Sequence, residues 1–245
     1  AGGAAAVGAR LVLGDRQRRR LAHYVPQPLA EALARTDRPA FEGLVLPAAV
    51  MFVDMVGFTA RSETASPNDT VDTMRRLHAE LESAAARHGG YVDSFAGDGA
   101  MLVFGVPRPR GDDAARALAC ARDLLVRTAQ QDLPVRIGLH FGPVQVARLG
   151  GRQQHQLTLA GDTVNLASRL MAVAKDRGVG LAVSAAAVAE VPETSPAPLA
   201  GMVYSAAVPI RGRQAPVDAW LGPRPADPAA HAGRETDGSR RRPPP

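Results

Sequence analysis

The amino-acid sequence predicts an α+β domain in which helices pack on a mixed, mostly antiparallel sheet. Along the centre of the chain, apolar runs of strand length alternate with longer helical patterns. Two of these runs flank the turn Gly97–Asp98–Gly99, as in a β-hairpin. The apolar fraction of 46% and the charged fraction of 22% are ordinary for a folded domain, which excludes collagen, coiled coil and wholesale disorder.

The first elements have clear sequence signals. Residues 49–55 form a continuous apolar run ending at an acid, which predicts a buried strand. A helix follows, with Ser66 as its cap and Pro67 in its first turn, and it extends to about Arg87, where Gly89–Gly90 end it. The remaining elements expected are strands over 91–95 and 100–104, a helix opening at Asp112–Asp113, strands over 134–141 and 144–149 on either side of Gly142–Pro143, a helix over 163–174, and strands over 179–184, 202–208 and 217–221.

Composition divides the chain into three parts. Residues 1–47 are expected to form a basic leader and helical linker, residues 48–221 a folded domain, and residues 222–245 a disordered tail rich in Pro and Arg. The two ends carry more positive charge than the whole chain's net +5, so the centre is close to neutral. A nucleic-acid partner is therefore not expected, because such a protein carries a basic stripe on its folded surface.

Cysteine and hydropathy limit the cellular context. Cys120 is the only cysteine, which excludes an internal disulfide and a cysteine metal site and fits a cytoplasmic location. The longest charge-free run, residues 194–210, contains three prolines and is too short to span a bilayer. In the leader the arginines follow an apolar stretch, the order expected where a membrane helix exits on the cytoplasmic side. A membrane tether upstream and a disordered basic leader both remain open.

Two acidic residues are candidate metal ligands. Asp54 closes a predicted strand, and Asp98 lies in a predicted hairpin turn between two glycines. Two carboxylates converging from adjacent strands would suit a hard divalent cation. The segment Gly57–Phe58–Thr59 enters a helix, whose free N–H groups favour a phosphate. The alternative is structural, with Asp54 as a helix cap and Asp98 as a turn former.

A third group lies in the segment 161–169. Asn165 and Arg169 are four residues apart and share a helix face. An amide beside a guanidinium suits a ribose hydroxyl and phosphate charge, although such a pair can also be ordinary helix surface. His140 is expected inside a strand and His155 in a polar loop, so neither is favoured as a metal ligand.

Four blocks in this order resemble the signatures of the class III nucleotidyl cyclases. They are Phe52-Val53-Asp54-Met55-Val56-Gly57-Phe58-Thr59, the run from Gly89 to Gly105, the run from Arg136 to Val144, and the run from Gly161 to Arg169. The resemblance covers residues 48 to about 221 and implies the ferredoxin-like α/β sandwich of that family. The segment from Arg18 to Pro26 also resembles the linker that joins membrane-anchored bacterial cyclases to their catalytic domain, which implies a sensor or membrane segment upstream.

The resemblance implies a role for each matching residue. Asp54 and Asp98 correspond to the aspartates that hold two Mg²⁺ or Mn²⁺ ions, with Met55 beside them, and Phe58 and Thr59 to the start of the phosphate-binding helix. Asn165 corresponds to the asparagine that orients the ribose, and Arg169 to the arginine that stabilises the transition state. Arg211 lies at a phosphate-contacting position that is lysine in the family, with Arg213 as the alternative because the register is weak there.

The base-reading positions depart from the family pattern. Thr158 matches a residue used by many bacterial adenylyl cyclases, whereas Ser94 stands where adenylyl cyclases usually have lysine and guanylyl cyclases glutamate. A serine hydroxyl both donates and accepts, so it does not dictate adenine over guanine. The resemblance therefore implies a homodimeric adenylate cyclase that converts ATP to cyclic AMP and pyrophosphate. Guanylate cyclase activity on GTP and a catalytically silent regulatory module are the alternatives.

Overall fold

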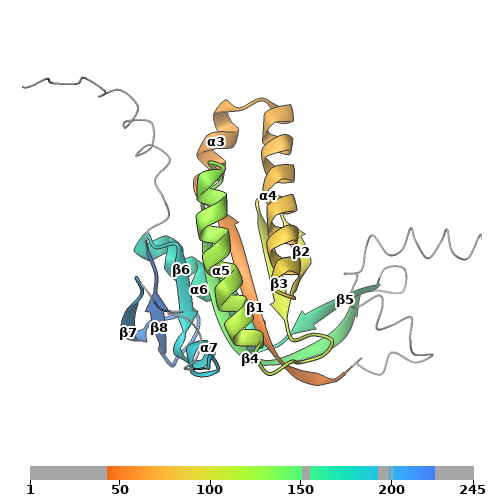
Figure 1. Ribbon diagram of the computed structural model, residues 1–245, viewed down its shortest axis with the longest axis vertical. Helices are drawn as coiled ribbons and strands as arrows, with labels where there is room; N and C mark the ends of the chain where they lie inside the picture. The colour runs from red at the N-terminus through yellow and green to blue at the C-terminus, as the bar shows by residue number, and fades with distance from the viewer. Residues whose placement is uncertain (1–42, 151–154, 193–198, 200, 224–245) are drawn as a thin grey trace, which may run out of the picture.

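The computed structural model describes residues 43–150, 155–192, 199 and 201–223 (Figure 1). Residues 1–42 of the expected leader and linker and nearly all of the expected tail lie outside this range. Residues 45–47, expected at the end of the linker, instead open the first strand of the sheet. The elements in chain order are β1 (Val45–Met55), α3 (Phe58–Thr64), α4 (Pro67–Arg87), β2 (Tyr91–Ala96), β3 (Gly99–Phe104), α5 (Asp113–Gln130), β4 (Val135–Gly150), β5 (His155–Ala160), α6 (Asp162–Arg177), β6 (Leu181–Ser184), α7 (Ala185–Ala189), β7 (Val203–Val208) and β8 (Val217–Leu221).

One sheet of eight strands organises the domain. Seven strands follow the order β2-β3-β1-β4-β6-β8-β7, and β5 folds back on β4. Only the β4–β6 pairing is parallel among the described strands. The sheet is thus mostly antiparallel with helices packed on it, which confirms the predicted α+β class.

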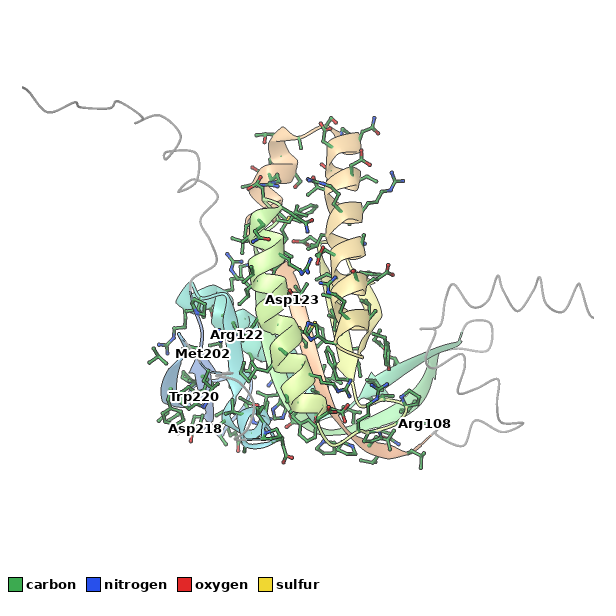
Figure 2. All side chains as sticks on the ribbon, in the orientation of Figure 1. Arg108, Arg122, Asp123, Met202, Asp218 and Trp220 are labelled. Atoms are coloured by element: carbon green, nitrogen blue, oxygen red, sulfur yellow. The ribbon has the colours of Figure 1, made fainter. Side chains whose placement is uncertain are left out.

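Alternation along β1 assigns the helices to the two faces of the sheet. Ala49, Met51 and Val53 belong to the larger core cluster, which they share with the buried residues of α4 and α5. These two helices lie side by side over β1 and β3 (Figure 1). Asp123 lies on α5 (Figure 2) and accepts hydrogen bonds from Arg87 and Arg127. Ala48 and Val50 point to the other face, into a second cluster that contains Ala167 of α6. The period of two in a strand therefore separates an α4/α5 face from an α6 face.

Helix α6 packs on β4 at backbone distance. A Cβ added to Gly138 would lie 2.1 Å from the backbone nitrogen of Met171 and 2.3 Å from the carbonyl oxygen of Ala167. Only a glycine permits this approach, because the atoms in the way belong to the helix backbone and cannot rotate aside. At the start of the helix, the Thr163 hydroxyl donates to the Pro143 carbonyl over 2.7 Å.

Several element boundaries differ from expectation. The two strands predicted on either side of Gly142–Pro143 are one strand, β4. Pro143 lies directly opposite Pro47, so the two residues that lack an N–H group form one pair of the antiparallel ladder. The pairing of β1 with β4 therefore continues on both sides of this pair. The polar loop predicted around His155 is wrong, since His155 opens β5. The short helices α3 and α7 had no periodic signal long enough to reveal them.

A β-bulge in β2 buries a carboxylate without a partner. Val92 pairs with Leu102 and Ser94 with Met101, so Asp93 is the extra residue. Among the residues that the structure describes, no hydrogen-bond partner is found for either Asp93 carboxylate oxygen or for the buried Tyr91 hydroxyl. Burial raises the pKa of Asp93 to about 6. The folded state therefore disfavours the charged form of this carboxyl.

Replacing Gly138 by alanine should separate α6 from the sheet. We expect Gly138→Ala to lower the free energy of unfolding by about 3 kcal/mol or more, because the new methyl group meets backbone atoms. Gly142→Ala is the matched control, since its Cβ would meet the rotatable Thr163 hydroxyl, 2.8 Å away, and should cost less. Urea unfolding measures the free energy of unfolding of both variants. Equal losses would contradict the view that the helix backbone limits how closely α6 packs on β4.

Replacing Asp93 by asparagine should change how stability depends on pH. The pKa of Asp93 is raised from 3.8 to about 6 on folding, so between these pH values the folded protein binds more protons than the unfolded chain. The free energy of unfolding of the wild type therefore falls as the pH rises through this window. We expect Asp93→Asn to gain about 1–3 kcal/mol relative to wild type between pH 3.5 and 7. The exposed Asp72→Asn is the control, and a pH-independent Asp93→Asn difference would contradict the burial of a charge.

Candidate active site

Two carboxylates meet at the end of β1. Asp54 is the last residue but one of β1 and lies directly opposite Gly99, the first residue of β3. Asp98 immediately precedes Gly99 in the tight turn after β2. A Cβ on Gly99 would lie 2.8 Å from the Val53 carbonyl oxygen, so the glycine lets the turn close against β1. The structure therefore brings together the two predicted metal ligands.

Helix α4 supports the turn that carries Asp98. The His78 ring nitrogen Nε2 lies 3.1 Å from the Gly97 carbonyl oxygen, and the His78 ring stacks on Phe95 with centroids 4.1 Å apart. These contacts hold the β2 side of the turn from the α4/α5 face. Asp98 is thus presented from a braced turn, not from a free loop.

The electrostatics at Asp54 favour a bound cation. Burial, and then the negative charge of Asp98, raise the pKa of the Asp54 carboxyl. Lys175 of α6 and Arg136 of β4 oppose this rise with their positive charges. A half-buried carboxylate beside a second negative charge is stabilised when a divalent cation takes the place of a proton.

The two carboxylates suit a hard cation such as Mg²⁺ or Mn²⁺ that takes its remaining ligands from molecules other than the protein. Carboxylate oxygens are the ligands these ions prefer. Within the described part of the chain, no group of three or more His, Cys, Asp or Glu side chains gathers to enclose an ion. Met55 has its side chain buried in the core at 2% exposure, so only its backbone carbonyl is available as a ligand. The remaining ligands would come from substrate or water.

The predicted nucleotide contacts on this side lie near the carboxylates. Phe58 and Thr59 open α3 directly after the turn at Gly57, which has the left-handed φ of 72°. Ser94 pairs with Met101, which in turn pairs with Phe52, so the three form one row across β2, β3 and β1. By the alternation in β1, Phe52 and Asp54 lie on the same face of the sheet. Ser94 is therefore two rows away from Asp54, on the same α6 face of the sheet.

A second group lies on the other side of α6. Asn165 is exposed and Arg169 is half-buried on the same helix face. The turn between β7 and β8 covers this face, because a Cβ on Gly212 would lie 3.5 Å from the Arg169 guanidinium. Arg213 in that turn pairs with Asp162, whereas Arg211 is exposed. This arrangement favours Arg211 over Arg213 as the residue available to a phosphate.

One chain does not bring the two groups together. Lys175, whose positive charge acts on Asp54, is six residues from Arg169, and the two side chains point about 120° apart around the helix. The turn against Arg169 belongs to β8, and β4 and β6 separate β8 from β1 in the sheet. Three strand spacings amount to about 14 Å. The Arg169 end of the pair therefore lies towards β8, away from the carboxylates at the end of β1. Among the described strands, β5, which carries Thr158, pairs only with β4.

His140 and Cys120 take no part in these groups. The His140 ring nitrogen Nδ1 lies 2.7 Å from the Ser184 hydroxyl inside the fold, and burial lowers the pKa of His140 to about 4. His140 lies in β4, as predicted. Burial raises the pKa of the Cys120 thiol to about 12, so this residue is an unreactive part of the core.

Sequence reasoning missed several contacts around the predicted site, although it named Arg213 as the alternative to Arg211. Arg136 lies opposite Asp54 on β4, and the positive charge of Lys175 on α6 lowers the pKa of Asp54. Asp162 and Arg213, 51 residues apart, join α6 to the β7–β8 turn. The local sequence carries no signal for these neighbours, because each depends on strand register or on helix docking.

Among the described residues, none of the helices combines the length and the hydropathy that a membrane span requires.

Known proteins share this sequence pattern and this fold. Residues 45–215 match the family described as the adenylate and guanylate cyclase catalytic domain. An adenylate cyclase of Mycobacterium tuberculosis is 35% identical over 162 residues, which cover 64% of this chain and 36% of that protein. The chain thus spans little more than a third of that relative.

Solved structures show the same architecture. A bacterial light-regulated adenylyl cyclase superposes with a TM-score of 0.74 over 87% of this chain and 62% of its own, at 20% identity, which bears on the fold alone. The guanylyl cyclase Cya2 superposes with a TM-score of 0.61 over 76% of this chain and 96% of its own, at 25% identity. By the match of residues 45–215 to the family pattern, this chain belongs to the adenylate and guanylate cyclase catalytic domain family.

Proposed function

We propose that this chain is a homodimeric adenylate cyclase that converts ATP to 3′,5′-cyclic AMP and pyrophosphate. One observation carries the proposal: α6 separates two incomplete and complementary groups, with Asp54 and Asp98 on one side and Asn165 and Arg169 on the other. Neither group alone can bind a triphosphate, orient its ribose and stabilise the transition state. Two copies related by a two-fold axis would complete two equivalent sites.

The metal-binding group would hold the triphosphate side of the substrate. Asp54 and Asp98 would bind two Mg²⁺ or Mn²⁺ ions, with the Met55 carbonyl beside them, and the ions would lower the pKa of the ribose 3′-hydroxyl and neutralise phosphate charge. Phe58 and Thr59 would offer backbone N–H groups to the phosphates. Lys175 and Arg136 add positive charge near the carboxylates and limit their repulsion of the substrate.

The partner chain would supply the groups that act on the reacting atoms. Asn165 would hydrogen-bond the ribose and so direct the 3′-oxygen towards the α-phosphorus. Arg169 would stabilise the charge that develops as the bond to pyrophosphate breaks. Arg211, exposed beside this face, would contact the phosphates.

The choice of base depends on Ser94 and Thr158. Thr158 favours ATP through the family resemblance, and the M. tuberculosis relative is named an adenylate cyclase. Ser94 discriminates weakly, and the similar structures include a guanylyl cyclase, so GTP is the alternative substrate. Ser94 is also the one feature that favours a silent regulatory module.

A nucleotide assay tests the activity and the base together. We expect the purified chain with Mn²⁺ to form cyclic AMP from ATP faster than cyclic GMP from GTP. Asp54→Ala should abolish both, because one metal ligand is lost. Measuring cyclic AMP and cyclic GMP by chromatography shows whether the chain is a cyclase and which base it prefers. Formation of neither product by a folded, dimeric protein would favour the regulatory module.

Mixing two inactive variants tests the shared site. Asp54→Ala and Arg169→Ala should each be inactive alone. After subunit exchange, half of the dimers would be mixed and each would hold one intact site, so activity should recover to about a quarter of wild type. A mixture that forms mixed dimers and still makes no product would contradict a site built from two chains.

A further inference from the structure

An ion pair ties the β7–β8 turn to the first turn of α6. Arg213 donates from Nη1 to the Asp162 carboxylate oxygen Oδ2 over 2.5 Å, across 51 residues of sequence. Asp162 is the first residue of α6, and Arg213 closes a turn whose backbone N–H donates to the Ile210 carbonyl over 3.0 Å. The pair therefore fixes this turn relative to the helix that carries Asn165 and Arg169.

The same turn lies against the Arg169 guanidinium. A Cβ on Gly212 would lie 3.5 Å from Nη2 and 3.7 Å from Nη1 and Cζ, so the guanidinium lies beside the side of Gly212 where a side chain would project. Gly212 has a φ of 72°, which a side chain would strain. Any shift of the turn would thus move the surface on which Arg169 rests.

The ion pair is not needed to hold the hairpin on the fold. Val208 and Ile210 are buried in a cluster with Leu166 and Leu170 of α6. Within the hairpin, Trp220 packs edge-on against Tyr204, and the Tyr204 hydroxyl donates to Asp218 over 2.8 Å (Figure 2). The Arg213 and Asp162 side chains are 32% and 66% exposed, and an ion pair as exposed as this stabilises a fold little.

The pair also cancels a negative charge where phosphate is expected. Asp162 lies three residues before Asn165, so the two are neighbours on the helix surface. Without Arg213, an unpaired carboxylate would stand beside the groups proposed to meet an anionic substrate.

We infer that the Asp162–Arg213 ion pair is a positioning clamp for the proposed nucleotide site. It holds the turn 210–213 against Arg169 and neutralises the carboxylate beside Asn165, so that Arg169 and Arg211 face the phosphates in a fixed arrangement. The inference rests on the proposed function. It assigns Arg213 to positioning and leaves phosphate contact to Arg211.

Kinetics of the clamp variants test the two roles separately. Arg213→Gln should raise KM for the nucleotide about fivefold, equivalent to about 1 kcal/mol, because it exposes the Asp162 charge. Arg213→Lys should retain most of the wild-type KM, because it keeps the charge. Asp162→Asn should lower kcat, because the released turn no longer holds Arg169 in place. Its effect on KM should be smaller, because the negative charge that would repel the nucleotide is also removed. The double variant Asp162→Asn/Arg213→Gln should lose less than the sum of the single losses.

Hydrogen exchange tests the clamp without turnover. In the nucleotide-free protein, Asp162→Asn and Arg213→Gln should each speed amide exchange in residues 209–216 severalfold, without lowering the unfolding midpoint by more than a few degrees. Arg127→Gln is the matched control, since it removes an exposed ion pair on the α4/α5 face. It should change neither exchange in this segment nor KM.

The two experiments distinguish failure of the clamp from failure of the proposed function. A wild type that turns over no nucleotide, with faster exchange only in the clamp variants, would overturn the cyclase proposal and retain the structural clamp. Active wild type with unchanged exchange, or with additive losses in the double variant, would overturn the clamp.

Discussion

Backbone contact between α6 and β4 is the constraint on which the rest of the domain depends. Gly138 lets the helix approach until its backbone at Ala167 and Met171 fills the space of a side chain. A helix held this close to the middle of the sheet divides the α6 face into two regions. The carboxylates lie at the end of β1 and the Arg169 guanidinium lies beside the β7–β8 turn, and the proposed shared site would join the two from different chains.

The two regions are supported in different ways. On the carboxylate side, buried β-pairing and the contact of His78 with Gly97 place Asp54 and Asp98 at fixed positions near the opposing charges of Arg136 and Lys175. On the other side, position depends on an exposed ion pair and a glycine turn. The first region resembles a rigid metal site, whereas the second region can respond to small movements of the β7–β8 turn. A dimer that joins the two would place rigid ligands opposite an adjustable surface.

Strand β2, at one edge of the sheet, carries buried polar groups that lower the stability of the fold. Asp93 and Tyr91 on β2 have buried oxygens without partners in the described part of the chain. Such groups cost stability that the apolar clusters on both sides of the sheet must offset. They lie on the strand that also carries Ser94, the position where the chain departs from the family pattern.

The sequence by itself determined the α+β class, most of the strands and helices, and the residues Asp54, Asp98, Asn165 and Arg169 as a candidate site. These follow from local signals: the period of two in strands, glycine turns and short motifs. The tertiary structure alone decided that β4 continues through Pro143, because that depends on Pro47 lying opposite it. It alone revealed Arg136 and Lys175 near Asp54 and paired Arg213 with Asp162, because register and helix docking bring together residues far apart in the chain.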